Sequence, residues 1–258
     1  MRETHKVNLP DGYRLAFYDR ISSTNAEAMR LAQTGELSGL WVQADSQSGG
    51  KGRTGRNWDS PSGNLYASLL LRPNVPIARA LQLSLLAGIA AHDAIMGLAA
   101  GVGLAPDVRL KWPNDILLGG AKIGGILLET VNMPGDQHPA IIIGTGLNLA
   151  FVPGELDRPV TSLAAGGVPV SADRAMSALA WASAEWLLQW NGGRAFDGIR
   201  SAWMERAQPV GGAISVHIGE DRLSGRFLGI DELGALRLSL ASGEERRITA
   251  GDVSLVAG

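Results

Sequence analysis

Gln47-Ser-Gly-Gly-Lys-Gly-Arg-Thr-Gly-Arg-Asn-Trp58 is a stretch of twelve residues that holds four glycines, three cations and no acidic residue. It lies between two segments with β-like patterns, 40–44 and 65–72, and is therefore predicted to be a loop that joins two strands. Glycine lets backbone N–H groups approach a ligand closely, while lysine and arginine supply charge and donors suited to phosphate or carboxylate. The stretch thus predicts an anion-binding loop.

This loop does not match the two common phosphate-binding patterns. A P-loop needs Gly-Lys-Ser/Thr after four intervening residues, and a dinucleotide fold needs G-x-G-x-x-G at the start of a helix. A flexible linker or an RG-rich nucleic-acid segment has a similar composition. The residues of the loop alone leave these two alternatives open beside the anion site.

Composition limits the classes of protein. The chain has 258 residues, of which 45% are hydrophobic and 19% charged, enough for a sizeable core in one large domain with or without a small appendage. The formal net charge of -2 argues against a general binder of nucleic acid or anionic membranes. Because the chain has no cysteine and only four scattered histidines, no disulfide framework and no metal site are predicted.

The most apolar segment, 84–105, is long enough to cross a membrane. His92 and Asp93 lie near its middle, however, where an acid costs about 2.5 to 3.5 kcal/mol on insertion scales. Helical spacing of its apolar residues predicts a buried helix instead. Residues 1–10 are polar and do not resemble a signal peptide, so the expected compartment is the cytoplasm.

The pattern along the first four fifths of the chain predicts an α+β fold with a mixed β-sheet and packed helices. Helices are expected after the capping box Thr24-Asn-Ala-Glu27, after Pro76, and at 171–190 and 196–206. The predicted strands are 13–18, 40–44, 65–72, 108–112, 116–118, 122–130 and 140–149.

The pattern changes to short strands and turns after Pro209-Val-Gly-Gly212. Four or five strands are expected there, in a small barrel of about 50 residues. We therefore predict a boundary near 208, with domains 1–208 and 209–258. The predicted strands of the second domain are 214–218, 222–230, 235–240 and 246–248.

A second dense motif is Val108-Arg-Leu-Lys-Trp-Pro-Asn-Asp-Ile116. Lys111 lies inside an apolar strand, which is costly unless the ammonium group meets an anion or reaches water. By residue type alone, the favoured interpretation is an edge-strand lysine with its head in solvent. Pro113 would end strand pairing, and Asn114-Asp115 would form the turn.

Five motifs in this order resemble the biotin–protein ligase family, over a region from about Tyr18 to Val256. No single motif decides this, but five in register are far more specific than one glycine loop. Two tail segments, 225–231 and 250–255, also resemble the small C-terminal barrel of that family. The five motifs are Ser22-Ser-Thr-Asn25, the loop 47–58 with Ser60-Pro-Ser-Gly-Asn-Leu-Tyr66, Lys111-Trp-Pro-Asn-Asp115, Lys122-Ile-Gly-Gly-Ile126 and Gly144-Thr-Gly-Leu-Asn148.

The resemblance implies a class II synthetase-like, biotin–lipoate ligase catalytic fold followed by an SH3-like β-barrel. It also implies two reactions, in which ATP with Mg²⁺ converts biotin to biotinyl-5′-AMP and the biotin then passes to a lysine of a biotin carboxyl carrier domain of acetyl-CoA carboxylase or a related enzyme. The first reaction brings a carboxylate against a polyphosphate, so cations must lie where negative charge accumulates.

Site residues follow from the matched motifs. Lys111 and Arg53 resemble the catalytic cations. No residue is assigned as a metal ligand, and the ligands of the magnesium ion are left open. Residues matching the biotin site are Ser23, Thr24, Asn25, Gln47, Gly50, Lys51, Gly52, Arg53, Lys111, Gly124 and Gly125. Residues matching the ATP and adenylate site are Arg53, Arg56, Trp58, Lys111, Asn114 and Asn148.

Some of these residues have simpler explanations. Thr24 is predicted as a helix N-cap with or without a ligand, and Trp58 and Asn148 have alternative roles as a loop-end packing residue and a turn residue. The family loop often has the pattern Gly-Arg-Gly-Arg-x-Gly-Arg, whereas Lys51 stands at the first arginine position, which keeps the charge and loses bidentate geometry. The contacts of Lys51 are therefore left open.

The partners are predicted less closely. Only 21 residues precede Ser22, too few for the DNA-binding module of some family members, so neither nucleic acid nor membrane is an expected partner. The sequence does not decide between a monomer and a homodimer, and it leaves the carrier protein and the role of the barrel open. A lipoate–protein ligase or octanoyltransferase is the nearest alternative, and a non-catalytic biotin-binding or RNA-binding module is another.

Overall fold

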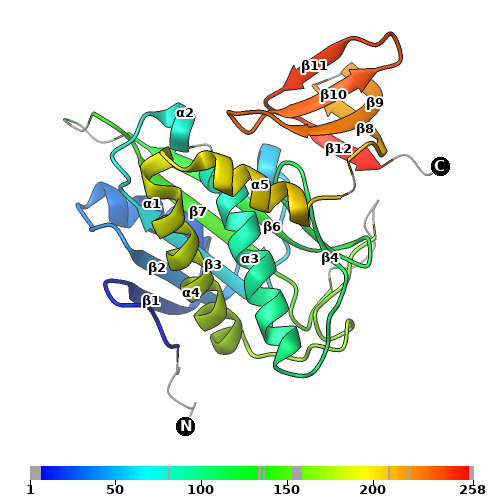
Figure 1. The fold of residues 1–258 in the computed structure, drawn as a ribbon. Coiled ribbons are helices and arrows are strands. Elements are labelled where there is room, and N and C mark those ends of the chain that lie inside the picture. The colour runs from blue at the N-terminus through cyan, green and yellow to red at the C-terminus, as the bar shows by residue number, and fades with distance from the viewer. Residues whose placement is uncertain are drawn as a thin grey trace.

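Two β-sheets make up the framework of the molecule (Figure 1). The computed structural model describes residues 7–255 except 81, 133, 134, 136, 153–158, 209 and 220. In the main sheet the strand order is β1-β2-β3-β7-β6-β5-β4, and only the β1–β2 pair is parallel, which confirms the predicted mixed sheet. Its strands are β1 (Arg14–Ile21), β2 (Leu40–Gln47), β3 (Leu65–Leu71), β4 (Val108–Lys111), β5 (Asp115–Leu118), β6 (Ala121–Val131) and β7 (Ala140–Leu147).

Helices cover both faces of this sheet. Strand residues alternate between the faces, so Trp41 packs with α3 and α4 whereas Val42 packs with α1. Both faces are buried, which explains why β3 and β7 are apolar along nearly their whole length. The helices are α1 (Thr24–Gln33), α2 (Ile77–Ala80), α3 (Gln82–Ala100), α4 (Ala172–Trp190) and α5 (Phe196–Arg206).

Helix α1 begins one residue earlier than the capping-box prediction. Ser23 is the N-cap, and its hydroxyl accepts from the Ala26 N–H at 3.4 Å. Glu27 accepts instead from Tyr18 and Arg30. The prediction of Thr24 as N-cap is wrong, and the buried Thr24 side chain takes part in a different hydrogen-bond network.

The apolar segment around α3 is a core helix. By length and composition Ile77–Ala100 could cross a membrane, but most of its apolar window is buried against the sheet, α4 and α5. Its Asp93 carboxylate accepts from Arg206 at 2.8 Å and from Trp186 at 3.0 Å. Although burial raises the pKa of Asp93, hydrogen bonds from His92 and Arg206 outweigh this effect and lower the pKa to about 2. Asp93 therefore forms part of an ordered polar contact between helices.

The C-terminal sheet is antiparallel, with the strand order β11-β10-β9-β8-β12. Its predicted strands are confirmed, but the expected barrel is not closed, because the described residues of β11 and β12 do not pair with each other. Residues of β12 instead lie against the main sheet and the glycine loop. The strands are β8 (Ala213–Ile218), β9 (Asp221–Ile230), β10 (Leu236–Leu240), β11 (Glu245–Ile248) and β12 (Asp252–Leu255).

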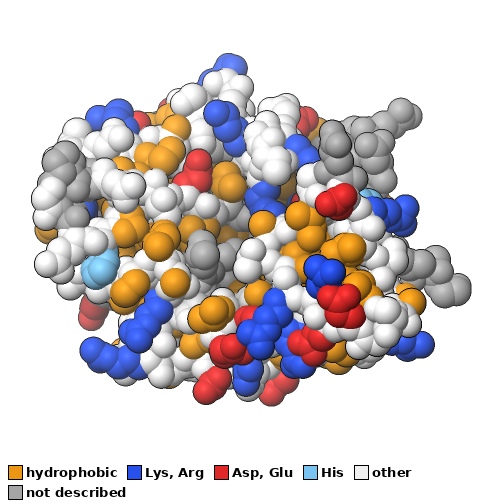
Figure 2. All heavy atoms as spheres, turned by 90° about the horizontal axis from the view of Figure 1, so that it is seen from above, with side chains coloured by type: hydrophobic (Ala, Val, Ile, Leu, Met, Phe, Trp, Pro, Cys, Tyr) orange, Lys and Arg blue, Asp and Glu red, His pale blue; other side chains and the backbone are white. Residues whose placement is uncertain are grey.

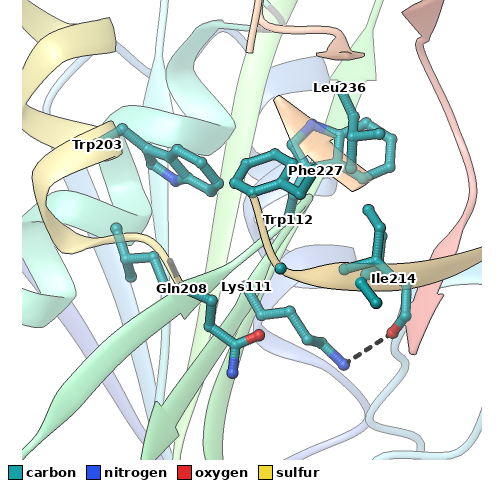
Figure 3. Close-up of a pocket in the computed structure, with 11 residues that line it drawn as sticks. Lys111, Trp112, Trp203, Gln208, Ile214, Phe227 and Leu236 are labelled. Atoms are coloured by element: carbon teal, nitrogen blue, oxygen red, sulfur yellow. Dashed lines mark hydrogen bonds between the residues drawn. The ribbon is translucent and has the colours of Figure 1, made fainter. Parts of the chain in front are cut away.

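The two sheets share one hydrophobic core. Trp112 donates through Nε1 to the Gly234 carbonyl at 3.1 Å, and Trp203 and Phe227 lie near it around a cavity of about 250 Å³ (Figure 3). On the face shown in Figure 2, the cationic and acidic side chains of the described residues are interspersed. Because the whole chain has a formal net charge of -2, the positive charge of the glycine loop is a local feature.

Candidate active site

A cleft of about 990 Å³ lies between the main sheet, the glycine loop and β12. One wall is formed by β4 to β7, and the opposite side by loop 47–58 and the start of α1. Five cations and two carboxylates line it among the described residues, an excess of three positive charges in a protein of formal net charge -2. The cleft therefore concentrates positive charge that the whole chain does not have.

At one end of the cleft the polar groups are neutral and bonded to each other. The Gln47 Oε1 atom accepts from the Thr24 N–H at 2.8 Å and lies 3.1 Å from the Thr24 hydroxyl. The Ser68 hydroxyl lies 2.8 Å from Thr24 Oγ1 and 2.5 Å from Asn25 Oδ1. These groups come from α1, β2 and β3, so three elements fix their positions.

Asn25 completes this neutral end. Its amide donates to Glu129 Oε2 at 2.7 Å and lies 3.3 Å from the Leu127 carbonyl. A side chain at Gly144 would place its Cβ only 2.3 Å from Asn25 Oδ1, so glycine is required there for the amide to reach the strand. Gly144 lines the cleft, and sequence reasoning did not single it out although the motif contained it.

The glycine loop folds back on itself before it reaches β3. The Gly52 N–H donates to the Arg56 carbonyl at 2.8 Å, and the Trp58 N–H donates to the Gly50 carbonyl at 3.0 Å. A short 3₁₀ turn, Arg53–Gly55, lies at the tip, where Gly55 has a φ of 74°. Arg53 and Arg56 therefore lie on either side of a tight turn that opens into the cleft.

Trp58 lies at the end of the loop and faces β6 and β7. A Cβ at Gly146 would be 2.9 Å from its Nε1 atom, and the Lys122 ammonium is 5.4 Å from the centroid of its ring. The Nε1–H is buried without a hydrogen-bond partner. This close approach to Gly146 favours the packing role of Trp58.

A buried carboxylate holds two lysines at the other end of the cleft. Lys111 Nζ lies 3.1 Å from Asp115 Oδ2, and Lys122 Nζ bonds to Oδ1 of the same group. Burial raises the pKa of Asp115, but the charges of Lys122 and Lys111 outweigh this effect and hold the pKa below its usual range. Lys111 is on the edge strand β4, as its residue type predicts, but its ammonium group is directed into the cleft and not into open solvent.

The C-terminal sheet supplies the remaining partners of the cations. The Asp252 carboxylate bonds to Arg56 and lies 3.5 Å from Arg53, which also donates to the Gly251 carbonyl at 3.1 Å. Lys111 donates to the Val253 carbonyl at 3.1 Å (Figure 3). Thus the start of β12 contacts three cations that come from two separate motifs.

Most of the predicted site residues meet in this cleft. Asn114 is among them, since its Oδ1 accepts from Arg53 at 3.3 Å. The predicted residues that line the cleft are Ser23, Thr24, Asn25, Gln47, Lys51, Gly52, Arg53, Arg56, Trp58, Lys111, Asn114 and Gly125.

Three predicted residues lie outside the lining. Gly50 is enclosed by Ser60 and the Trp58 carbonyl, and Gly124 packs against Leu147. The Asn148 side-chain amide donates to the Thr161 carbonyl at 3.1 Å, a contact between two segments of the chain. Direct substrate contacts of these three residues remain predictions.

Sequence reasoning missed three charged residues of the cleft, Asp115, Lys122 and Asp252. The argument made for Lys111, that a lysine inside an apolar strand needs an anion, applies equally to Lys122. Asp252 gives no comparable signal, because its partner Arg56 is 196 positions away in the chain.

Comparison with known proteins agrees with this geometry. Residues 17–148 match the model of the biotin/lipoate A/B protein ligase family, and residues 212–256 match the biotin protein ligase C-terminal domain. This chain belongs to the biotin protein ligase family. The first match covers the glycine loop and the seven-stranded sheet except the start of β1, and the C-terminal sheet lies within the second match.

Relatives resemble the chain over most of its length. A biotin–[acetyl-CoA-carboxylase] ligase of Paracoccus denitrificans is 41% identical over 233 residues, which covers 88% of this chain and 94% of the relative. The Mycobacterium tuberculosis protein of the same name is 32% identical over 237 residues, covering 90% and 85%. The biotin protein ligase from Aquifex aeolicus in complex with biotin and ATP superposes with a TM-score of 0.78 at 26% identity, covering 95% and 99%.

Proposed function

We propose that this protein is an ATP-dependent biotin–protein ligase that attaches biotin to one lysine of a biotin carboxyl carrier domain. The observation that carries this proposal is the junction, in one cleft, of a neutral hydrogen-bonding end with an end that has an excess of cations. Biotin combines a ureido ring, an apolar tail and a carboxylate. We assign these parts to the neutral end, to apolar lining side chains such as Ile126 and Leu127, and to the cationic end.

The neutral end suits the ureido ring because its donors and acceptors are already held in place. We assign ureido recognition to Ser23, Thr24, Asn25 and Gln47. A ligand without this ring would form no hydrogen bonds with these groups beyond those they already make, whereas a ureido group can form additional hydrogen bonds with them. Buried polar groups of this kind reject analogues that lack the matching polar atoms more strongly than apolar pockets reject a missing methylene.

Adenylation takes place at the cationic end. A carboxylate oxygen of biotin attacks the α-phosphorus of ATP, the bond to the β-phosphate bridging oxygen breaks, and pyrophosphate leaves. Lys111 is placed to neutralise the carboxylate and the α-phosphate as they approach, with Arg53 assisting and Arg56 binding the adenylate. Cations that are fixed before the reaction stabilise the transition state without a further reorganisation cost.

Transfer to the carrier follows from the same geometry. The neutral amine of the carrier lysine attacks the acyl carbon, an amide bond forms, AMP leaves with the bonding electrons, and the amine loses a proton. The glycine loop and Trp58 would cover the adenylate and exclude water until the carrier arrives. We propose the same role for Gly52 and Gly55, whose backbone allows the loop to approach the ligand.

Magnesium fits this site as a companion of ATP. Among the described residues no group of three or more His, Cys, Asp or Glu could hold a metal ion. Mg²⁺ usually binds substrate phosphates together with several waters and supplies charge neutralisation there. We therefore expect the ion to enter on the triphosphate, with the cations of the cleft acting beside it.

The proposal also assigns a role to each of the two domains. We take residues 1–208 as the catalytic domain and 209–258 as the C-terminal domain, whose β12 supplies the contacts to the glycine loop. The acceptor is a carrier domain of acetyl-CoA carboxylase or a related enzyme, and the place of action is the cytoplasm. The formal net charge of -2 supports a protein partner over nucleic acid.

Intact-mass measurement of a carrier domain tests this function. The protein, ATP, Mg²⁺ and a biotin carboxyl carrier domain are incubated with biotin, lipoate or octanoate in separate reactions. We expect the mass of one biotinyl group on the carrier, its loss when the acceptor lysine is replaced by arginine, and no addition from the other two acids. Addition of a lipoyl or octanoyl group without biotinylation would instead favour the lipoate ligase alternative.

A further inference from the structure

The buried carboxylate of Asp115 has two cationic partners, and only one of them is accounted for by the proposed reaction. Asp115 and Lys122 are each 8% exposed, and Lys122 Nζ bonds to Asp115 Oδ1. Lys111 binds the other oxygen at 3.1 Å. The three groups together carry one net positive charge, because two ammonium groups face one carboxylate.

The charge balance around Asp115 depends on the second lysine, Lys122. If Lys111 were the only partner of Asp115, the pair would be neutral, and moving Lys111 toward an anion would leave a buried carboxylate without compensation. Such an uncompensated buried charge is strongly unfavourable. With Lys122 in place, Asp115 keeps a counter-ion when Lys111 turns to the substrate.

The surroundings of the two lysines differ as expected if Lys122 stays bound to Asp115 while Lys111 turns to the substrate. Besides its bond to Asp115, the Lys122 ammonium group lies 5.4 Å from the Trp58 ring centroid and beside Gly125, where an added Cβ would be 3.4 Å from Nζ. Lys111 has the more exposed side chain, 18% against 10%, and reaches across to the Val253 carbonyl at 3.1 Å. Lys122 is therefore the fixed partner, and Lys111 the one that can exchange.

We propose that Lys122 is a positioning residue for Lys111: it keeps Asp115 compensated so that the charge of Lys111 is available to the acyl phosphate. This inference rests on the proposed adenylation function, and it adds to it a residue that acts through Asp115. Lys122 also determines how strongly Lys111 is held in the absence of substrate.

Biotin-dependent ATP–pyrophosphate exchange by charge-matched variants tests the proposal. In Lys122→Met, Asp115 binds Lys111 alone, and we expect kcat to fall about tenfold while the KM for biotin changes by less than about threefold. The double variant Asp115→Asn/Lys122→Met restores the net charge of the wild type and should recover kcat to within about threefold. Lys122→Arg should retain most of the rate. Arg109→Met, which removes an exposed cation from the strand that carries Lys111, serves as control.

A purely structural role would give a different result. If Lys122→Met keeps the wild-type kcat, or if the double variant is no faster than Lys122→Met, Lys122 does not act through Asp115 and the inference is wrong. Circular dichroism and thermal unfolding of each variant show whether a lost rate reflects a lost fold.

Labelling of Lys111 tests the pairing without turnover. Acetic anhydride acylates neutral amines. In Lys122→Met the Asp115 carboxylate interacts with Lys111 alone and favours its charged form, so acetylation of Lys111 should slow about threefold or more. Peptide mass spectrometry measures this rate. In Asp115→Asn/Lys122→Met the labelling rate should return to that of the wild type or exceed it. Unchanged labelling in Lys122→Met would overturn the inference, whereas absence of biotin-dependent exchange in the wild type would overturn only the proposed function.

Discussion

At the neutral end of the cleft the residues that line it are uncharged, and Thr24, Asn25 and Gln47 are held by hydrogen bonds, one of them from Asn25 to the Glu129 carboxylate. At the cationic end, by contrast, the lining residues Lys111, Arg53 and Arg56 are charged and form ion pairs with carboxylates. Neutral groups that are already bonded bind a matching ligand with little rearrangement. Ion pairs exchange partners when another anion arrives. The difference indicates that one end recognises the substrate and the other carries out the chemistry.

The cationic end itself contains two kinds of ion pair. The Arg56–Asp252 pair is partly exposed, with side chains that are 55% and 35% accessible, and exposed pairs contribute only about 0–1 kcal/mol. A phosphate can therefore replace Asp252 at little cost. The Asp115 pairs are buried, so Asp115 stays in place and sets the charge available to Lys111.

Removing Lys111 should have the largest effect. We expect Lys111→Ala to lower the kcat of adenylation by about 10²–10³-fold, because it removes charge from the transition state. The fold should persist, since Asp115 retains Lys122 as its counter-ion. Exchange kinetics with circular dichroism measure both properties, and wild-type rates would return Lys111 to the role of an ordinary edge-strand lysine.

A change at the neutral end should act on binding. Gln47→Ala leaves the Thr24 N–H without its acceptor, and a lost buried hydrogen bond of about 1–3 kcal/mol raises the KM for biotin about 5- to 150-fold. The kcat should change much less than in Lys111→Ala. Ser46→Ala, on the same strand, provides the matched control. A large loss of kcat with unchanged KM would contradict the assignment of recognition to this end.

The smallest effect is expected at Asp252. Asp252→Asn removes the carboxylate that an incoming phosphate must replace, so the KM for ATP should fall by about two- to fivefold, as expected for a partly exposed pair. High salt should reduce the difference between variant and wild type, because ions screen exposed charges. Initial rates at varied ATP concentration provide the measurement. A raised KM would show that Asp252 holds the arginines in their active position and does not compete with ATP.

The sequence predicts much of the fold because its periodicities agree with the tertiary environment. The apolar runs at 65–72 and 140–149 become adjacent central strands buried on both faces. The sequence predicts Thr24 as the N-cap of α1, whereas the structure has Ser23 in that role. Both residues carry a hydroxyl group that suits a cap, and only the tertiary contact of Thr24 with Gln47 shows which of them caps the helix. Closure of the C-terminal barrel was predicted from strand number, but which sheet edges pair depends on contacts with the main sheet.

Residue types alone predict only part of the candidate site. They left the role of loop 47–58 open and favoured solvent for Lys111, whereas the family resemblance predicted that both belong to one site, and both line the same cleft. The pairing of Asp252 with Arg56 could not be predicted, because no local pattern connects residues from two sheets. Gly144 and Gly146 show the same limit, since their importance comes from the side chains of Asn25 and Trp58 that approach them.

ATP–pyrophosphate exchange by the wild-type protein, with biotin, lipoate and octanoate tested side by side and no carrier present, is the most direct measurement of the central claim. We predict exchange with biotin alone, because only biotin engages the neutral end and presents a carboxylate to the cationic end at the same time. Exchange with lipoate or octanoate at a comparable rate, or none with biotin, would contradict the account.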